Sequence, residues 1–457
     1  MTSLATGRGT FPHGIHPPER KHPAAEAPIE VLPTPAEVRI ALLQHLGAPC
    51  EATVSPRTEV NLGDLVGDSK AFVSAPVHAS VTGLTGRTSV ATLPNGRHVP
   101  VIPIKAAGSG PSAETQPFSG QSLFDDIFGG DWPKDSFDQY EPQQILDAVR
   151  KAGLVGLGGA AFPTHVKLTR NPDKPIHTLL INACECEPYL TSDYRLMLEA
   201  PAPIITGALL AQRAIGAQRT IICIEDNKPD AARTLRQAAE GASIQVNVLR
   251  TKYPQGDERQ LIVSVLGAEV PTGGLPLDIG IVVLNVGTCA ALARAVLRGK
   301  PLTHRIVSVS GGGIKQPKNL LVPIGASYGD LVTYCGGFTD DVARVVAGGP
   351  MMGFTIGALD VPVTKGASGL TALSQTEVRK ADETTCVRCG RCVDVCPVGL
   401  VPTKIALASK AGDMALAQRY HIIACMECGC CAYVCPASIP LVQLIRLGKV
   451  RLPKAKA

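Results

Sequence analysis

The sequence has 457 residues, of which 45% are hydrophobic and 18% are charged. This length is sufficient for about three or four domains, and the composition excludes a largely disordered chain. Aromatic residues make up 4% of the sequence, with a single Trp, which argues against an aromatic-lined nucleic-acid surface.

The N-terminal stretch MTSLATGRGTFPHGIHPPERKHP lacks the apolar core of a signal peptide. We therefore expect a reducing, cytoplasmic setting, in which cysteines stay free for other chemistry. The most apolar stretch, 279–296, is interrupted by Asn285 and Arg294. It predicts a buried strand and helix, so the chain is not expected to span a membrane by itself.

Residues 1–105 contain short strand-like runs at 71–83, 87–93 and 98–104, with turn signals between them. This pattern predicts a small all-β module. The run PAEVRIALLQHLG, 35–47, has a helix-like pattern, although three prolines crowd it. Residues 106–140 are rich in Gly, Ser, Pro and Asp and predict a linker, whose apolar run SLFDDIF can dock on a neighbour.

From residue 141 the pattern changes to helices alternating with short apolar strands, which predicts a parallel sheet covered on both faces. Residues 301–375 return to β-type alternation with many glycines, and predict a second small domain with a helix or two. The expected helices are 141–152, 202–216, 229–240, 256–266 and 288–298, and the expected strands are 177–183, 219–225, 243–249 and 278–285.

A glycine-rich loop, GLVGLGGAAFPTHVK, occupies 153–167. Its small residues bring backbone N–H groups together, as in loops that cradle phosphate, and Lys167 adds positive charge. The loop follows a helix-like stretch instead of a strand, so it does not fit the dinucleotide fingerprint. On pattern alone, a phosphate loop and a tight packing turn both remain open.

The next strand ends in Asn182-Ala-Cys-Glu-Cys-Glu-Pro. Glu185 and Glu187 lie at the carboxyl end of this strand, where α/β sheets place ligands, and residues two apart on a strand share a face. This acidic pair is suited to a ribose hydroxyl or a nicotinamide amide, and a solvated turn is the alternative. Cys184 and Cys186 have the same spacing, but two thiols alone make a weak metal motif.

Residues 376–457 hold two cysteine runs with the spacing C-x2-C-x2-C-x3-C-P. This is the bacterial ferredoxin spacing, in which three cysteines bind one [4Fe–4S] cube and the fourth binds the other. Zinc and disulfides are the alternatives, but zinc sites usually pair two C-x2-C halves over a longer gap. The crossed pairing predicts Cys386, Cys389, Cys392 and Cys435 on one cube, and Cys425, Cys428, Cys431 and Cys396 on the other.

The formal net charge of +5 counts each Cys as neutral. Two cubes with eight thiolates would leave about +1, so the charge balance indicates little about an anionic partner. Between the cysteine runs, 402–412 and 413–424 predict two helices, with Pro402 in a first turn, Gly412 as a stop and Asp413 as a cap. The last ten residues are basic and predict a frayed tail.

The stretches GLVGLGGAAFPTHVKL, INACECEPYLTSD, TKYPQGDERQL and LNVGT resemble the RnfC family, the C-type subunits of the Rnf electron-transport complex. The segments HGIHPPERK, SAPVHASVTG and GGPMMG extend this resemblance over nearly the whole chain. More distantly, the middle of the chain resembles the flavoprotein subunit of respiratory complex I. The resemblance implies a multidomain α/β plus β fold: a barrel-sandwich (lipoyl-like) module at 1–105, a linker at 106–140, a Rossmann-like FMN- and NADH-binding domain at 141–300, a β-grasp-like (SLBB) ligand-binding block at 301–375, and a helical two-[4Fe–4S] ferredoxin domain with a basic tail at 376–457.

The resemblance also implies the cofactors FMN, bound non-covalently, NAD(H), and two [4Fe–4S] clusters. Cys184 stands where the complex I flavoproteins have Asp, which removes one expected flavin contact. The implied cofactor-binding residues are Gly156, Gly158 and Lys167 around the FMN, Phe162 stacking on NADH, Asn182, Glu185 and Glu187 beside flavin and nicotinamide, Tyr253, Gly256 and Glu258 bordering the same pocket, and Asn285 and Thr288 on the flavin's other side.

The implied function is an oxidoreductase subunit of a membrane-bound, ion-translocating ferredoxin:NAD⁺ oxidoreductase. The flavin exchanges two electrons with NAD(H) and single electrons with the clusters, so no catalytic acid or base is expected. The resemblance implies integral-membrane partner subunits, a ferredoxin-linked electron carrier, and a peripheral position on the cytoplasmic face of the inner membrane. Two alternatives are an electron-wiring subunit without a working flavin site and a soluble NADH dehydrogenase.

Overall fold

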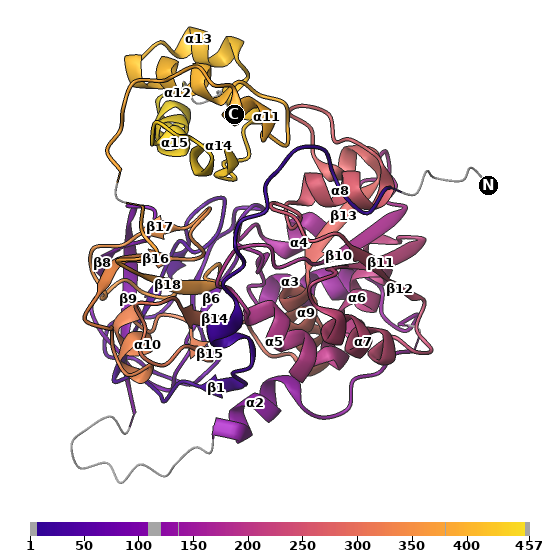
Figure 1. Ribbon diagram of the computed structural model, residues 1–457. Helices are drawn as coiled ribbons and strands as arrows, with labels where there is room; N and C mark the ends of the chain where they lie inside the picture. The colour runs from indigo at the N-terminus through magenta and orange to yellow at the C-terminus, as the bar shows by residue number, and fades with distance from the viewer. Residues whose placement is uncertain (1–6, 108–119, 136, 380, 453–457) are drawn as a thin grey trace.

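The computed structural model describes residues 7–107, 120–135, 137–379 and 381–452. Figure 1 shows the cysteine-rich helices gathered at the top, above the contact between a mainly β part and an α/β part. None of the described helices has the length and apolar character needed to cross a bilayer.

The N-terminal module consists of two small antiparallel sheets around a core that includes Val38, Ile40 and Ile104. The larger sheet has the strand order β2-β9-β7-β4 with β8 against β9, and the smaller sheet is β3-β5-β6. The strands are β2 (Glu37–Ala41), β3 (Glu51–Ala52), β4 (Glu59–Val60), β5 (Leu65–Asp68), β6 (Val77–His78), β7 (Gly83–Thr85), β8 (Ser89–Thr92) and β9 (His98–Ala106).

The helix expected at 35–47 is wrong, because β2 occupies this stretch. Val38 and Ile40 are fully buried while Glu37 is exposed, which is the two-residue alternation of a strand. Prolines at 33 and 35 also favour an extended backbone at the residue before each of them. The prolines and the alternation therefore outweigh the helix-forming residues.

The segment before β2 does not join the sheets of this module. It forms α1 (His22–Ala25) and β1 (Ile29–Val31), and β1 pairs in parallel with a strand of a different sheet. In Figure 1 this indigo segment runs from beside α8 down between the two halves of the molecule.

The predicted linker at 106–140 contains a helix, α2 (Gly120–Phe128). Leu123, Phe124 and Ile127 from SLFDDIF pack against the main core, and Trp132 is buried there too. The expected docking of this apolar run is confirmed, while the description as a plain linker is wrong for these residues.

The α/β part is built on the parallel sheet β12-β11-β10-β13, as predicted. One face carries α3, α6 and α9 over a large apolar core, and α8 covers the other face. All the expected helices and strands are present within about three residues. The elements are α3 (Pro142–Lys151), α4 (Thr164–Leu168), β10 (Thr178–Ala183), α5 (Ser192–Glu199), α6 (Pro201–Ile215), β11 (Arg219–Glu225), α7 (Pro229–Ala238), β12 (Ile244–Leu249), α8 (Glu258–Leu266), η1 (Pro276–Ile279), β13 (Ile281–Asn285) and α9 (Val286–Arg298).

The second β part is a mixed sheet with the order β1-β15-β14-β18-β16-β17 and one helix, as expected for a small mixed domain. Its core includes Val307, Leu320 and Leu370. The elements are β14 (His304–Ser310), β15 (Lys318–Pro323), α10 (Tyr328–Tyr334), β16 (Val342–Ala347), β17 (Phe354–Thr355) and β18 (Gly369–Ser374).

The cysteine-rich part is helical, and its predicted helix signals are confirmed. Pro402 opens α12, Gly412 ends it in a left-handed conformation, and the Asp413 side chain accepts a hydrogen bond from the Leu416 N–H. The elements are α11 (Arg391–Asp394), α12 (Pro402–Ala411), α13 (Met414–Arg419), η2 (Ile422–Ala424), α14 (Cys430–Tyr433) and α15 (Leu441–Arg451).

The expected frayed tail is wrong for the residues that the structure describes. α15 continues to Arg451, and Lys449 bonds to the Cys425 carbonyl at 2.6 Å and to Glu427 at 2.7 Å. The remainder of the predicted tail, 453–457, lies outside the described residues.

Candidate flavin and iron–sulfur sites

The glycine-rich loop turns back on itself directly after α3. The Gly156 N–H donates to the Phe162 carbonyl at 2.8 Å, and the Leu157 N–H donates to Thr288 Oγ1 at 2.9 Å. Gly158 lies so close to Asn285 that an added Cβ would be 3.4 Å from the Asn285 Cβ. Three of the predicted positions, Gly158, Asn285 and Thr288, therefore meet in one place, while Phe162 is half-buried.

Asn285 fixes the start of α9 on the opposite side of this loop. Its Oδ1 accepts from the N–H groups of Gly287 and Thr288, and its Nδ2 donates to Asp193 at 2.6 Å. Burial, and the nearby Glu185 carboxylate, raise the pKa of Asp193 to about 7. The helix start is therefore tied to the loop on one side and to α5 on the other.

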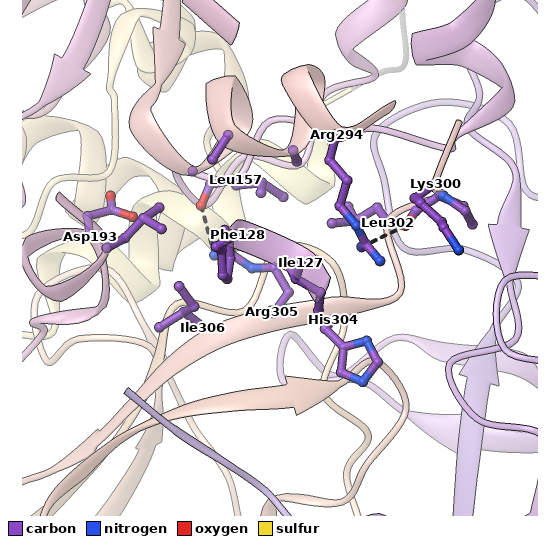
Figure 2. Close-up of a pocket in the computed structure, with 15 residues that line it drawn as sticks. Ile127, Phe128, Leu157, Asp193, Arg294, Lys300, Leu302, His304, Arg305 and Ile306 are labelled. Atoms are coloured by element: carbon purple, nitrogen blue, oxygen red, sulfur yellow. Dashed lines mark hydrogen bonds between the residues drawn. The ribbon is translucent and has the colours of Figure 1, made fainter. Parts of the chain in front are cut away.

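A cavity lies behind the glycine-rich loop, between α2, α9 and β14 (Figure 2). Arg305, from β14, reaches across it and donates to the Leu157 carbonyl at 3.0 Å. Burial lowers the pKa of this guanidinium to about 10, so it stays charged at neutral pH. Arg305 thus holds the back of the loop, a role that no sequence motif indicated.

The carboxyl end of β10 is joined to the loop before α8. Asn182 Nδ2 donates to the Gly256 carbonyl at 2.7 Å, and the Gly256 N–H donates to Cys186 Sγ at 3.3 Å. The Cys184 thiol faces the sheet core and donates to the Cys223 carbonyl at 3.2 Å. Cys184 and Cys186 therefore point to different surroundings and do not form a joint metal site.

The two carboxylates of the CECEP stretch do not share a face, because β10 ends at Ala183. Glu185 is buried and accepts from Ser192 Oγ and from the N–H groups of Asp193 and Tyr194, at 2.9–3.2 Å. It therefore caps α5. This helix was absent from the predicted elements, although the run Thr191-Ser192-Asp193 before apolar residues is a helix-start signal.

Glu187 faces the other way, toward the loop between β16 and β17. It accepts from the N–H groups of Met351 at 3.2 Å and Met352 at 2.7 Å. Burial raises the pKa of Glu187 to about 7. The carboxylate thus connects the end of β10 to the second β part, and Lys21 donates to the Glu187 carbonyl at 2.9 Å.

Lys167 forms an ion pair with Glu258 at 2.9 Å, and both side chains are partly exposed. This pair joins the end of α4 to the start of α8, where the Asp257 side chain caps the helix by accepting from two N–H groups. The structure therefore gathers Gly158, Lys167, Asn182, Gly256, Glu258 and Asn285 around the strand ends of one sheet, with Gly158 and its neighbours Gly159 and Ala160 exposed.

Such a set fits FMN and NAD(H). The exposed glycines allow a flat ring or a phosphate to approach the backbone, Lys167 offers positive charge, and the strand ends are the usual ligand position in α/β sheets.

Five cysteines line one cavity in the helical part: Cys430 and the four predicted ligands Cys396, Cys425, Cys428 and Cys431. Burial raises the pKa of the Cys431 thiol, and the charges of the three neighbouring thiols raise it further. Thiolates crowded in this way require a compensating positive charge, which the iron of a cluster supplies. This grouping takes three cysteines from the second run and one from the first, as the crossed pairing predicts.

Three of the other four predicted ligands belong to the same core, and the fourth, Cys389, does not. Cys392 and Cys435 are buried there, Cys386 is half-buried and Cys389 is exposed. None of the 15 cysteines forms a disulfide, so that alternative is excluded. We name the two groups the inner set (Cys396, Cys425, Cys428, Cys431) and the outer set (Cys386, Cys389, Cys392, Cys435).

The inner set touches the flavin-site residues through a buried contact. Tyr253 is only 1% exposed, and its hydroxyl donates to the Cys428 carbonyl at 2.6 Å. Cys186 and Met351 pack in the same small cluster with Cys430. Tyr253 was predicted to border the flavin pocket; the structure places its ring in this contact with the cluster loop.

Family comparisons agree with this division of the chain. Residues 149–294 match the Nuo51 FMN-binding domain, and residues 379–436 match a 4Fe–4S dicluster domain. Residues 9–109 match the RnfC barrel sandwich hybrid domain, and residues 306–355 match the SLBB domain. The dicluster match favours two [4Fe–4S] clusters over zinc, as the cysteine spacing predicts.

The chain is 42% identical over 438 residues to the C-type subunit of the proton-translocating ferredoxin:NAD(+) oxidoreductase complex of Clostridium ljungdahlii, covering 96% of this chain and 93% of the relative. It belongs to the RnfC family. A second member, from the Na(+)-translocating complex of Acetobacterium woodii, is 40% identical over 87% of each chain.

A third RnfC family member, from the ion-translocating oxidoreductase complex of Rhodobacter capsulatus, is 40% identical over 97% of this chain and 83% of its own length. Among solved structures, an NAD⁺-reducing [NiFe]-hydrogenase in the H2-reduced state is 21% identical, with a TM-score of 0.48, over 69% of this chain and 63% of that chain. This likeness is too weak to carry an argument about the RnfC site.

Proposed function

We propose that this chain is the NADH-, FMN- and iron–sulfur-containing subunit of a membrane-bound, ion-translocating ferredoxin:NAD⁺ oxidoreductase. Family membership and the matches to an FMN-binding and a dicluster domain support the cofactors. The observation that carries the proposal is the buried hydrogen bond between Tyr253 and the Cys428 carbonyl, because it brings a flavin-type strand-end site against a cluster loop.

When bound, FMN supplies the conversion between two-electron exchange with NAD(H) and one-electron exchange with the clusters. The residues of the chain position these groups. The Lys167–Glu258 pair and the exposed Gly158 border the space at the strand ends. Asn182 holds the loop at Gly256 in place, and Arg305 holds the glycine-rich loop from behind.

The packing of the cysteines supports an order for the two clusters. The inner set shares the apolar contact of Tyr253, Cys186 and Met351, so a cube held by it would lie beside the flavin site. The outer set reaches the surface at Cys389, so a cube held by it would be the one accessible to other proteins. No side chain is required to act as an acid or base in this sequence of transfers.

The relatives are named as subunits of multisubunit complexes, two of them ferredoxin:NAD(+) oxidoreductases. We therefore propose that this chain binds integral-membrane partner subunits and exchanges electrons with a ferredoxin-linked carrier. Its place would be the cytoplasmic face of the inner membrane, as a peripheral subunit.

A cofactor inventory tests the proposal. Anaerobically purified chain should contain about eight iron, about eight sulfide and about one FMN, and should reduce a small dye with NADH. Iron and sulfide without flavin or NADH activity would favour a wiring subunit instead. Co-purification with integral-membrane subunits distinguishes the proposed role from a soluble dehydrogenase.

A further inference from the structure

The loop that holds most of the outer set is exposed along its length. Val387 is 66% exposed, and Arg388, Cys389, Gly390 and Arg391 are exposed as well. The inner set differs at one position, because Cys428, which occupies the same place in its run as Cys389, is buried. A cube on the outer set would therefore sit directly beneath a surface made by 387–391.

This surface is positively charged. Arg388, Arg391 and Lys404 are exposed, and none has an acidic partner among the residues that the structure describes. Lys404 follows Thr403, whose hydroxyl is 3.1 Å from Cys392 Sγ. Arg379 donates to the carbonyls of Cys435 and Pro436 at 3.1 and 3.2 Å, so a further cation lies at the last outer cysteine.

The acidic side chains nearby do not cancel this charge. Glu383 is engaged by Lys410 at 2.8 Å. Two further acids, Asp382 and Asp394, are exposed near the loop, and the Asp394 backbone carbonyl contacts His13 Nδ1 at 2.8 Å. The four cations Arg379, Arg388, Arg391 and Lys404 therefore outnumber these two acids, and Val387 is exposed in the loop itself.

We propose that Val387, Arg388 and Arg391, flanked by Arg379 and Lys404, form the docking face for a one-electron carrier protein with an acidic contact surface. The inference rests on the proposed function in one respect, that the outer set holds a cube. Docking brings the carrier's redox centre close to that cube, and one electron passes from the reduced to the oxidised centre without bond formation or proton transfer.

An electron carrier fits this face better than a permanent partner. Transient redox interfaces are small, and charge complementarity supplies most of their speed and orientation. An exposed Val in a loop with cations around it matches that description, whereas an obligate interface would present a larger apolar surface. The cations also attract an acidic carrier from a distance, an effect that salt weakens.

The test is a double charge reversal, Arg388→Glu with Arg391→Glu, in the full chain with both cubes verified by EPR. Stopped-flow mixing with a reduced, acidic two-cluster ferredoxin measures the rate of cluster reduction. We expect at least a tenfold loss at low ionic strength that shrinks as salt is added. Dithionite-reduced variant should reduce the basic protein cytochrome c faster than the unchanged chain does.

The matched control is Arg233→Glu with Arg236→Glu on α7, which makes the same change in net charge on exposed residues far along the chain. An equal rate loss in this control, or less than a twofold loss in the test variant, would overturn the docking face. Should charge reversal displace the outer cube, Arg388→Gln with Arg391→Gln should still lower the rate about threefold, and an unchanged rate there would also overturn it.

Binding of the unchanged chain, but not of the test variant, to anionic phosphatidylglycerol vesicles, with unchanged ferredoxin rates, would assign the face to lipid and reject the carrier. Because the electrons come from ferredoxin or dithionite, this test does not use the flavin. Absence of FMN or NADH activity would therefore count against the proposed function alone.

Discussion

Gly256 lies where the end of β10 and the loop before α8 come closest. A Cβ at this position would be 2.3 Å from the Cys184 carbonyl oxygen, a distance that real side chains do not reach. The same residue accepts from Asn182 and donates to Cys186. Asn182, Cys184 and Cys186 are thus positioned by one glycine.

We predict that Gly256→Ala forces these two loops apart and lowers both FMN content and NADH-dependent dye reduction more than tenfold. Iron content should remain about eight, because the cluster loops are tied by other contacts. The control is Gly357→Ala, where an added Cβ meets nothing within 4 Å. Flavin retained at full occupancy in Gly256→Ala would show that this contact does not shape the pocket.

Sequence reasoning about single residues was clearest where spacing alone determines chemistry. The four cysteines of the inner set are grouped across two runs as the ferredoxin spacing requires. It failed for Glu185, since its partners belong to a helix that had not been predicted. Arg305 was also missed, because its contact with Leu157 joins residues 148 positions apart.

At the scale of elements, α15 holds the inner cluster loop through one carboxylate. Glu427 lies between Cys425 and Cys428 and pairs with Arg446 at 2.9 Å and Lys449 at 2.7 Å. Glu427 itself has a positive φ of 59°, a backbone conformation that needs support from its surroundings. The two ion pairs together stabilise both the helix position and the shape of the loop.

Glu427→Ala should release this loop and weaken the inner cube selectively. We expect iron to fall from about eight toward about four per chain during chelator treatment, while the outer cube remains visible by EPR. Glu383→Ala is the matched control, because it breaks a similar ion pair, with Lys410, near the outer loop. Simultaneous loss of both cubes in Glu427→Ala would contradict a local effect.

The elements themselves were predictable where their periodicity was long. Every expected helix and strand of the α/β part is present, since a buried parallel sheet with amphipathic helices has an unmistakable pattern. β2 was predicted wrongly because five residues are too few to distinguish the two-residue period of a strand from the 3.6-residue period of a helix. α2 was missed because polar and glycine-rich neighbours dominate the composition of the stretch around it.

At the scale of the whole molecule, Lys365 joins three parts of the chain. Its ammonium donates to the Pro76 carbonyl of the N-terminal module and to the Gly153 carbonyl beside the glycine-rich loop. Its backbone N–H donates to Gln44 Oε1 at 2.9 Å. The side chain is 1% exposed, and burial lowers the pKa of its amine to about 7.

Lys365→Met should destabilise the molecule, because the two buried carbonyls lose their donor at a cost of about 1–3 kcal/mol each. The pKa of the lysine rises from about 7 in the folded chain to 10.5 in the unfolded chain. The unfolded chain therefore binds more protons between these values, and this lysine contributes more stability as pH rises.

The expected result is a gap in thermal midpoint between unchanged chain and Lys365→Met that widens from pH 7 to pH 9. Lys315→Met, at an exposed position, should show no such gap. If the gap narrowed with rising pH, the folded chain would favour the charged ammonium over the neutral amine. That result would contradict the lowering of the Lys365 pKa by burial.

The N-terminal segment has a consequence for how the molecule is made. Its residues Gly7, Gly14 and Ile15 form backbone hydrogen bonds with Val265, Val395 and Tyr253, respectively, and β1 pairs with β15. The ribosome synthesises this segment first, and its partners, at positions 253–395, follow only after more than half of the chain has been made. Until these partners have been made, the N-terminal segment cannot connect the carboxyl ends of the strands to the inner cysteine loop. Cofactors can be inserted during this interval.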